Sequence, residues 1–324
     1  MSHRGAGWQV TVRGLWVLAL CLALACQAKR DSPPGPAEVA EPRSAVTLVV
    51  VGSYPAAAIA EMEPLVRWLN EALAPEGRKA VVRVATTVPE AAAWLAEGTA
   101  DVYFDSPHPV MLARHLSECR PILRRWKFGT PTYDSLLFVR ADSGIRQLED
   151  LRGRTIAFED RYSSSSFFLP MDFLLSQGYE GVFLGVADDP MPTDRIGFVL
   201  SGGDSNTMHW VLAGRVAAGA MNDWNLNQLA GDERSQLHIL ATTDEVPRHL
   251  VAVRTDLDPV VEARLRGLLM SAHESPEGRA MLAAFSQTDR FDDLPPEFVA
   301  DMDRMQKMVV ELEQRVSADL EAAP

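Results

Sequence analysis

The sequence predicts an α/β protein built as two lobes. Strand-like apolar runs alternate with segments of helical apolar spacing along most of the chain, as α/β folds require. A middle block, residues 137–247, repeats this alternation between two extended segments at 135–140 and 250–254. The last third of the chain has helical spacing throughout. Together these observations predict two lobes joined by two hinge crossings, with additional helices at the C-terminal end.

The first predicted elements belong to lobe one, which we expect to comprise residues 45–136 together with 248–324. A buried strand at 45–51 precedes a helix at 61–73 with apolar residues at helical spacing. The elements predicted next are a strand at 81–84, a helix at 88–96 opened by Thr87, a strand at 101–104 and a short helix at 109–116.

The middle block, residues 137–247, is the predicted lobe two. Its expected elements are strands at 155–158, 181–184 and 216–221 and helices at 166–177 and 206–213. Lobe one then resumes with helices at 258–274, 277–285 and 296–320. The last helix carries an apolar stripe that predicts packing on lobe one, since two heptads are short for a coiled coil: Phe298, Met302, Met305, Val309, Leu312 and Val316.

The N-terminal segment predicts export. Arg4 and Arg13 precede an apolar stretch at 15–25 that is too short to span a bilayer but fits a secretory signal peptide, residues 1–25. The sequence Ala-Leu-Ala-Cys ending at Cys26 resembles a lipobox, which makes Cys26 the expected lipidation site on a membrane-anchored lipoprotein.

The alternative is an ordinary signal peptide cleaved near Ala25 or Ala28. Residues 26–44 are rich in Pro, Ala and charge, which predicts a disordered tether.

Composition limits the possible partners. The formal net charge is −13, which argues against nucleic acid or an anionic membrane surface as partner. Cys119 is the one cysteine expected in the folded part, so no intrachain disulfide is predicted. Hydrophobic residues make up 47%, enough for two lobes with substantial cores. We expect a monomer in which any anion is bound by local donors.

Four consecutive serines lie within TIAFEDRYSSSSFFLP, residues 155–170. A strand that ends near Glu159 and restarts as a helix near Ser165 leaves main-chain N–H groups without intrahelical partners, and serine hydroxyls add donors there. Four or five hydrogen bonds to a charged acceptor can bind a small oxyanion with micromolar affinity, about −8 kcal/mol. The alternative is a serine-rich loop or helix cap without a ligand.

This run carries a family resemblance. FEDRYSSSSFFLP resembles the motif Phe-x-Asp-Pro-x-Ser-Thr-Ser-x-x-x-x-Pro of the phosphate/phosphite/phosphonate-binding proteins of ABC importers, with similarity over about residues 46–310. The resemblance implies the type II periplasmic-binding-protein fold, in which two lobes close over a small ligand. It also implies that Ser163, Ser164 and Ser165 bind the anion.

Three weaker matches imply further ligand-binding residues. VGSYP supplies an aromatic that covers the ligand, ADVYFDSPHP supplies the loop after a lobe-one strand, and SGGDSNTMHW supplies the second helix start of lobe two. The residues implied are Tyr54, Ser106, His108, Asp204, Ser205 and Asn206.

The chain departs from the family pattern at three positions. The family commonly has His at Asp204, Pro at Arg161 and Asp at Ala217. A carboxylate 4 Å from a dianion is repelled by about 4 kcal/mol, so we expect Asp204 to accept a proton from the ligand, from either P–OH or an aminoalkylphosphonate ammonium. The alternative is that Asp204 caps a helix starting near Asn206.

Arg161 is a candidate bidentate ligand of the oxyanion, the alternative being a solvated loop residue. Asp223 follows a strand where a lobe-two loop faces the predicted cleft, so it could bind an amine or cap a helix. His108 could donate to a ligand oxygen, although a lone histidine after proline is often a surface residue. The other histidines lack metal-ligand spacing, and we expect neither a metal nor a cofactor.

These observations predict an exported binding protein that captures phosphate, phosphite or a phosphonate and delivers it to an ABC permease, and that is not an enzyme. One alternative is a sensory binding protein that presents its ligand to a membrane receptor. A serine hydrolase is a further alternative, but the sequence has no Gly-x-Ser-x-Gly elbow and no histidine placed to act as a base.

Overall fold

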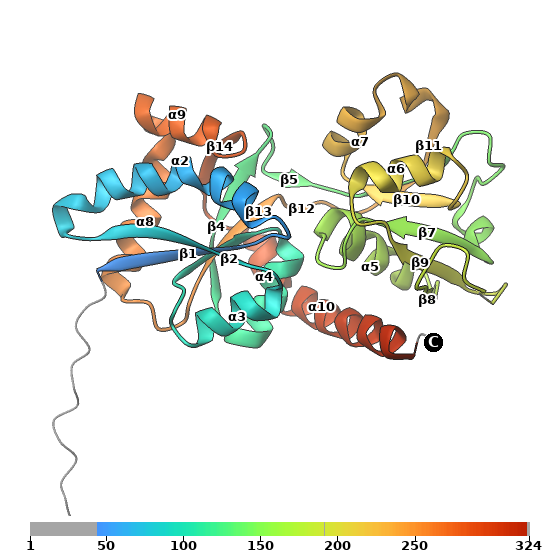
Figure 1. Ribbon diagram of the computed structural model, residues 1–324, viewed down its shortest axis with the longest axis horizontal. Helices are drawn as coiled ribbons and strands as arrows, with labels where there is room; N and C mark the ends of the chain where they lie inside the picture. The colour runs from blue at the N-terminus through green and yellow to red at the C-terminus, as the bar shows by residue number, and fades with distance from the viewer. Residues whose placement is uncertain (1–43, 191, 323–324) are drawn as a thin grey trace, which may run out of the picture. The chain divides into compact units, whose positions relative to one another are not determined.

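The computed structural model describes residues 44–190 and 192–322 (Figure 1). The predicted signal peptide, Cys26 and nearly all of the predicted tether lie outside these residues. Within the described ranges, no helix combines the length and apolarity needed to cross a membrane. The described part holds two six-stranded sheets and a short two-stranded one.

The first sheet belongs to lobe one and has the order β14-β4-β13-β3-β1-β2. Its first three strands in sequence pair in parallel, and the later strands join antiparallel. The strands are β1 (Ala45–Val51), β2 (Lys79–Ala85), β3 (Val102–Asp105), β4 (Arg120–Lys127), β13 (His249–Val253) and β14 (Thr288–Asp292).

Helices cover this sheet through apolar stripes. Leu65 and Leu69 of α2 pack in one core with Leu48 of β1. The Thr87 hydroxyl accepts from the Glu90 N–H at 3.2 Å, which confirms the predicted start of α3. The helices are α2 (Pro55–Leu73), α3 (Val88–Ala96), α4 (Pro107–Ser117), α8 (Pro259–Ser271) and α9 (Pro276–Ala284).

The second sheet belongs to lobe two and has the order β11-β6-β10-β7-β9-β8. Its aromatic core includes Phe158, whose ring centroid lies 5.6 Å from that of Phe167 and 5.5 Å from that of Phe198. The elements are β6 (Leu136–Arg140), β7 (Arg154–Phe158), β8 (Gly181–Phe183), β9 (Ile196–Leu200), β10 (Ala218–Met221), β11 (Leu237–Thr242), α5 (Leu169–Ser176), α6 (Asp204–Leu212) and α7 (Asp223–Ala230).

The segments that connect the sheets differ from the prediction. The two-stranded sheet pairs β5 (Thr132–Tyr133) with β12 (Val246–Pro247). The extended segments expected to be the crossings are instead β6 and β13, and each pairs with two neighbours inside a main sheet. The expected crossings were therefore misplaced, because a central strand and an extended connection share the same apolar sequence pattern.

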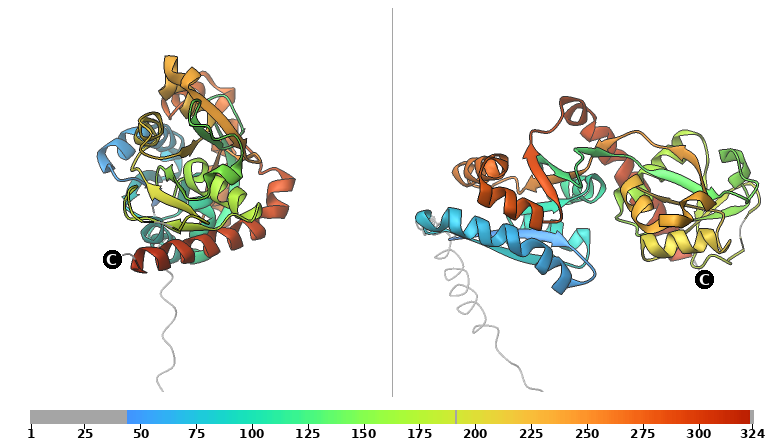
Figure 2. Two further views of the ribbon diagram at one scale, coloured as in Figure 1. Left: turned by 90° about the vertical axis from the view of Figure 1, so that its right-hand side faces the viewer. Right: turned by 90° about the horizontal axis from the view of Figure 1, so that it is seen from above.

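The C-terminal helix α10 (Pro296–Ala322) can be followed in both views of Figure 2. Five residues of its predicted apolar stripe are buried, and the sixth, Met302, is partly buried. Arg114 of α4 donates to Asp303 at 2.8 Å, which attaches the helix to lobe one as expected. Farther along, Glu313 pairs with Arg161, so α10 also contacts the serine loop of lobe two.

Candidate functional site

The serine run forms an unusually wide helical turn. Residues Ser164–Phe168 make a π-helical turn that continues into α5, whereas the sequence predicted an ordinary helix from residue 166. The Ser163 hydroxyl caps this turn by accepting from the Ser166 N–H at 3.1 Å. Single π turns are rare and concentrate at functional sites. The start of the helix therefore presents both hydroxyls and main-chain donors at one point.

Ser164 joins the two lobes. Its hydroxyl accepts from the main-chain N–H of His108 at 2.9 Å and donates to the Ser106 hydroxyl at 2.9 Å. Ser106 and His108 lie at the start of α4 in lobe one. The structure thus brings Ser164 to Ser106 and the backbone of His108, which lie more than fifty residues before it in sequence.

A buried hydrogen-bond network continues from Ser106 into lobe one. Asp105 accepts from the Ser106 N–H at 2.7 Å and from the Tyr103 hydroxyl at 2.7 Å. Burial raises the pKa of Asp105 to about 6. Burial also raises the pKa of Tyr133 to about 12, while hydrogen bonding to Ser164 and Ser106 acts in the opposite direction.

The other end of the serine run faces two carboxyl groups. Asp204 accepts from the Ser166 hydroxyl at 2.8 Å and also from the Asn225 side-chain amide. Burial, followed by the nearby charge of Asp204, raises the pKa of Glu159 to about 7. Burial likewise raises the pKa of Asp204, against its hydrogen bonds with Ser166 and Asn225. This pair therefore holds less negative charge near neutral pH than two free carboxylates.

Asp204 does not act as the helix cap that the alternative proposed. Gly203 is the N-cap residue of α6, and Asp204 is the first helical residue. Ser205 and Asn206 follow it with exposed side chains, and the Asn206 amide donates to the Ser201 carbonyl at 2.8 Å. Ser165 accepts from Asn222 at 3.2 Å, just before α7. Asp204 thus lies at the start of α6, and Ser165 contacts the residue that precedes α7.

The remaining predicted site residues are placed differently. Tyr54 precedes α2 and is 80% exposed, and Asp223 is an exposed residue at the start of α7. Arg161 forms an ion pair with Glu313 of α10 at 2.5 Å and contacts Ser317 at 3.4 Å. The guanidinium of Arg161 is thus already paired within the protein, unlike both alternatives raised from the sequence.

The side chain of His108 is fully buried, so it is not the surface residue that the alternative expected. Its ring stacks on Phe168 at 5.1 Å, and neither ring nitrogen has a hydrogen-bond partner among the described residues. Burial, followed by the charge of Arg161, lowers the pKa of His108 to about 3. His108 is therefore neutral at pH 7, and its main-chain N–H is the group that reaches Ser164.

Sequence reasoning missed Phe128, Tyr133 and Arg248, which lie beside this cluster. Phe128 of lobe one stacks on Trp224 of lobe two, with ring centroids 3.9 Å apart and planes 4° from parallel. Arg248 lies over Phe128 at 5.0 Å and over Tyr133 at 4.9 Å. Phe128 adopts a positive φ of 60°, which is strained for a bulky side chain. No local motif marks these residues.

The family model described as "ABC transporter, phosphonate, periplasmic substrate-binding protein" matches residues 48–297. The chain belongs to this family. It is therefore a periplasmic substrate-binding protein of an ABC transporter, in a family whose members bind a small molecule and work with a permease. The predicted family and the predicted two-lobed fold are confirmed.

Solved structures show the same fold. The binding protein is similar to XAC2383 from Xanthomonas citri bound to ATP, at 26% identity and a TM-score of 0.79, covering 85% of this chain and 100% of that one. It also resembles PhnD1 from Prochlorococcus marinus in complex with methylphosphonate, at 15% identity and a TM-score of 0.61. The match covers 82% of this chain and 97% of that one. A binding protein component of an ABC phosphonate transporter from Pseudomonas aeruginosa, PA3383, is 15% identical with a TM-score of 0.59. The match covers 86% of this chain and 99% of that one.

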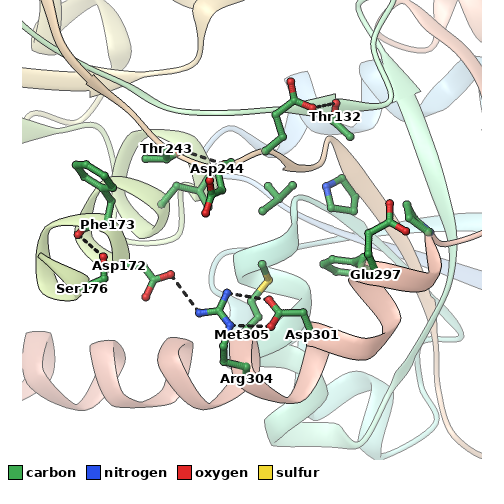
Figure 3. A pocket seen from close by; sticks show the side chains of 16 residues that line it. Thr132, Asp172, Phe173, Ser176, Thr243, Asp244, Glu297, Asp301, Arg304 and Met305 are labelled. Carbon is green, nitrogen blue, oxygen red and sulfur yellow. Dashed lines mark hydrogen bonds and ion pairs between the residues drawn. The ribbon is translucent and has the colours of Figure 1, made fainter.

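The binding protein also has a pocket of about 420 Å³ beside the β5–β12 connection (Figure 3). Its lining includes five acidic residues and one arginine: Asp172, Asp244, Glu245, Glu297, Asp301 and Arg304. Arg304 is already paired with Asp301 at 2.7 Å and with Asp172 at 3.6 Å (Figure 3). Such a lining repels anions, so we place the candidate anion site at the serine run instead. Among the described residues, no cluster of His, Cys, Asp or Glu could hold a metal ion.

Proposed function

We propose that the binding protein captures a small phosphorus oxyanion (phosphate, phosphite or a phosphonate) between its lobes and delivers it to an ABC permease. The observation that carries this proposal is the position of Ser164, whose hydroxyl contacts the lobe-one residues Ser106 and His108. An anion bound at Ser164 would receive donors from both lobes. The lobes we propose are residues 45–136 with 248–324, and residues 137–247.

Ser163 and Ser165 are the proposed neighbours of Ser164 in the anion site. Hydrogen bonds to a charged acceptor contribute about 1.5 to 3 kcal/mol each, and more when water is excluded. The carboxyl pair Glu159 and Asp204 would face a different part of the ligand. Protonated Glu159 would donate to a ligand oxygen there, while Asp204 would accept a hydrogen bond from a P–OH group or from the ammonium of an aminoalkylphosphonate.

Cleft closure is the proposed mechanism of capture. We propose that the lobes move about β5 and β12, and that Tyr54 closes over the ligand from lobe one. We also propose that Cys26 is lipidated and anchors the protein outside the cytoplasmic membrane, which mass spectrometry of the exported protein would test.

A second candidate ligand is a nucleotide. The 26% identical protein from Xanthomonas citri was solved with ATP bound. The stacked rings of Phe128 and Trp224, close to the serine run, resemble the aromatic surfaces on which bases stack. A nucleotide would then place its phosphates at the serines and its base against these rings.

Titration calorimetry and thermal unfolding with phosphate, phosphite, methylphosphonate, aminoethylphosphonate, ATP and sulfate test both candidates. A true ligand at a hundred times its dissociation constant adds about 2.7 kcal/mol of stability. Ser164→Ala should weaken binding by about 1.5 to 3 kcal/mol through loss of a charge-assisted hydrogen bond. The matched control is Ser176→Ala, at an exposed serine near the end of α5.

Binding of a phosphorus oxyanion that is lost in Ser164→Ala and kept in Ser176→Ala would support the first candidate. Binding of ATP alone would favour the second. The proposed site would be contradicted if no phosphorus compound binds, or if Ser164→Ala and Ser176→Ala bind equally well.

A further inference from the structure

Arg248 is a buried cation without an anionic partner in the described part of the chain. Arg248 directly follows β12 in the sequence and is only 4% exposed. Its Nε has no hydrogen-bond partner among the described residues, and none of their carboxylates pairs with its guanidinium. Burying a charge without an ion-pair partner strongly destabilises the folded protein, because no attraction offsets the free energy of removing the charge from water.

Aromatic rings and main-chain pairing hold this guanidinium in place. Phe128 and Tyr133 lie 5.0 and 4.9 Å from it, and the Arg248 N–H donates to the Pro131 carbonyl at 2.8 Å. Cation–π contacts stabilise a cation only in part, because they do not use its N–H donors. The Nε–H donor of the guanidinium therefore remains without a hydrogen-bond acceptor among the described residues.

The same rings connect Arg248 to the serine run. The Tyr133 hydroxyl is near enough to Ser164 and Ser106, the pair that joins the two lobes, for both to oppose the rise in its pKa. Trp224 of lobe two stacks on the Phe128 ring that Arg248 contacts. Arg248 and Ser164 thus share Tyr133 as a common neighbour.

Neighbouring positive charges also favour the binding of an anion beside Arg248. Burial lowers the pKa of Lys127 to about 8, and the charges of Arg125 and Arg248 act in the same direction. The acidic groups facing this cluster are Glu61, 3.7 Å from Lys127, and Asp105, whose pKa burial raises to about 6. Arg125, Lys127 and Arg248 therefore form a locally positive region in a chain of net charge −13.

We infer that Arg248 is the cationic ligand of the bound oxyanion, donating through its guanidinium to oxygens that the serine run binds from the other side. This inference rests on the proposed function and adds to it a charge requirement: the ligand presents at least one full negative charge toward Arg248. A planar guanidinium suits this role because it can donate two parallel hydrogen bonds to one phosphoryl or carboxylate group.

The test compares Arg248→Met and Arg248→Lys with a matched control, Arg290→Met. Arg290 also lies over an aromatic ring, 3.9 Å from that of Trp126, and its Nε is also buried without a hydrogen-bond partner. Each full-length variant is titrated with phosphate, methylphosphonate and ATP, and its unfolding temperature is measured without ligand.

We expect Arg248→Met to bind about 100-fold more weakly, as the loss of a bidentate charged contact implies. Arg248→Lys should retain part of the affinity, because it keeps the charge without the planar donors. Arg290→Met should bind within about twofold of the unmodified protein. Without ligand, Arg248→Met should unfold at the same or a higher temperature, because it removes an unpaired buried charge.

Binding by Arg248→Met within about threefold of the unmodified protein would overturn the inference while leaving the proposed function intact. If the unmodified protein binds none of these three anions, and neither phosphite nor aminoethylphosphonate, the proposed function fails, and the unliganded measurement still tests whether Arg248 is a structural cation. A fall in unfolding temperature as large as that of Arg290→Met would then identify a structural cation and overturn the inference. An unchanged or higher temperature would support it.

Discussion

The carboxyl groups of Glu159 and Asp204 lie beside the serine run, the proposed anion site. Burial and mutual repulsion keep a proton on this pair near neutral pH, with the pKa of Glu159 raised to about 7. A protonated carboxyl group can donate to an oxyanion, whereas a carboxylate repels it. At the scale of single residues, the protonation of Glu159 therefore governs whether this end of the site attracts or repels the ligand.

This reasoning predicts a pH-dependent affinity. The folded-state pKa of Glu159 lies above its ordinary value of 4.5, so the protonated form is lost as pH rises through about 7. Ligand affinity should fall between about pH 6 and pH 8, and Glu159→Gln should remove this part of the profile. Calorimetric titration at several pH values in this range gives the dissociation constant of each protein. Because both proteins bind the same ligand, their difference at each pH removes the contribution of ligand ionisation.

Asp160→Asn is the matched control, because it removes the same charge from an exposed neighbouring residue. Parallel profiles for Glu159→Gln and the unmodified protein would contradict the assigned role of Glu159.

The helix α10 contacts both lobes through charged side chains. Glu313 pairs with Arg161 of the serine loop, and Arg114 of α4 pairs with Asp303. The side chains of Arg161 and Glu313 are only 25% and 13% exposed. The helix therefore connects the serine loop of lobe two with α4 of lobe one.

We predict that Glu313→Gln lowers the free energy of unfolding by about 2 kcal/mol, because it leaves a largely buried guanidinium without its charge partner. Glu63→Gln, which breaks the exposed Arg67–Glu63 pair of α2, should cost less than about 0.5 kcal/mol. Urea denaturation of both variants measures the difference. Equal costs would show that the Arg161–Glu313 pair contributes no more than a surface ion pair.

At the scale of the whole molecule, an anion must approach a protein of formal net charge −13. The field of the entire chain therefore opposes the approach of an anion, while Arg125, Lys127 and Arg248 attract it only at short range. Salt shortens the Debye length from about 30 Å at 0.01 M to about 8 Å at 0.15 M, which screens the distant charges more than the near ones.

The association rate of a phosphorus oxyanion should consequently rise with ionic strength over this range. Stopped-flow measurement of tryptophan fluorescence gives this rate, since Trp224 stacks directly on Phe128 beside the proposed site. Repeating the series with salts of different anions at one ionic strength separates screening from competition. A rate that falls as salt increases would mean that the local cations, and not the net charge, control the encounter.

Local patterns in the sequence determined much of the fold. The strand at 45–51 has the predicted bounds, and the helix at 88–96 begins after Thr87 as predicted, because apolar spacing and capping involve neighbouring residues. The serine run was likewise recognised as a helix start from adjacent residues. By contrast, β4 and β14 were missed, since their many charged residues hide the apolar pattern of a strand, and Arg124 meets its partner Asp292 only when the two strands pair.

Only the tertiary structure decided which polar groups lack partners. Nothing near Arg161 in the sequence indicates that Glu313 neutralises it, and nothing near Arg248 indicates that no carboxylate among the described residues does so. Phe128, Tyr133 and Trp224 meet around Arg248 because two lobes bring distant segments together. Secondary structure follows from local sequence, whereas burial and charge pairing depend on contacts between residues far apart in the chain.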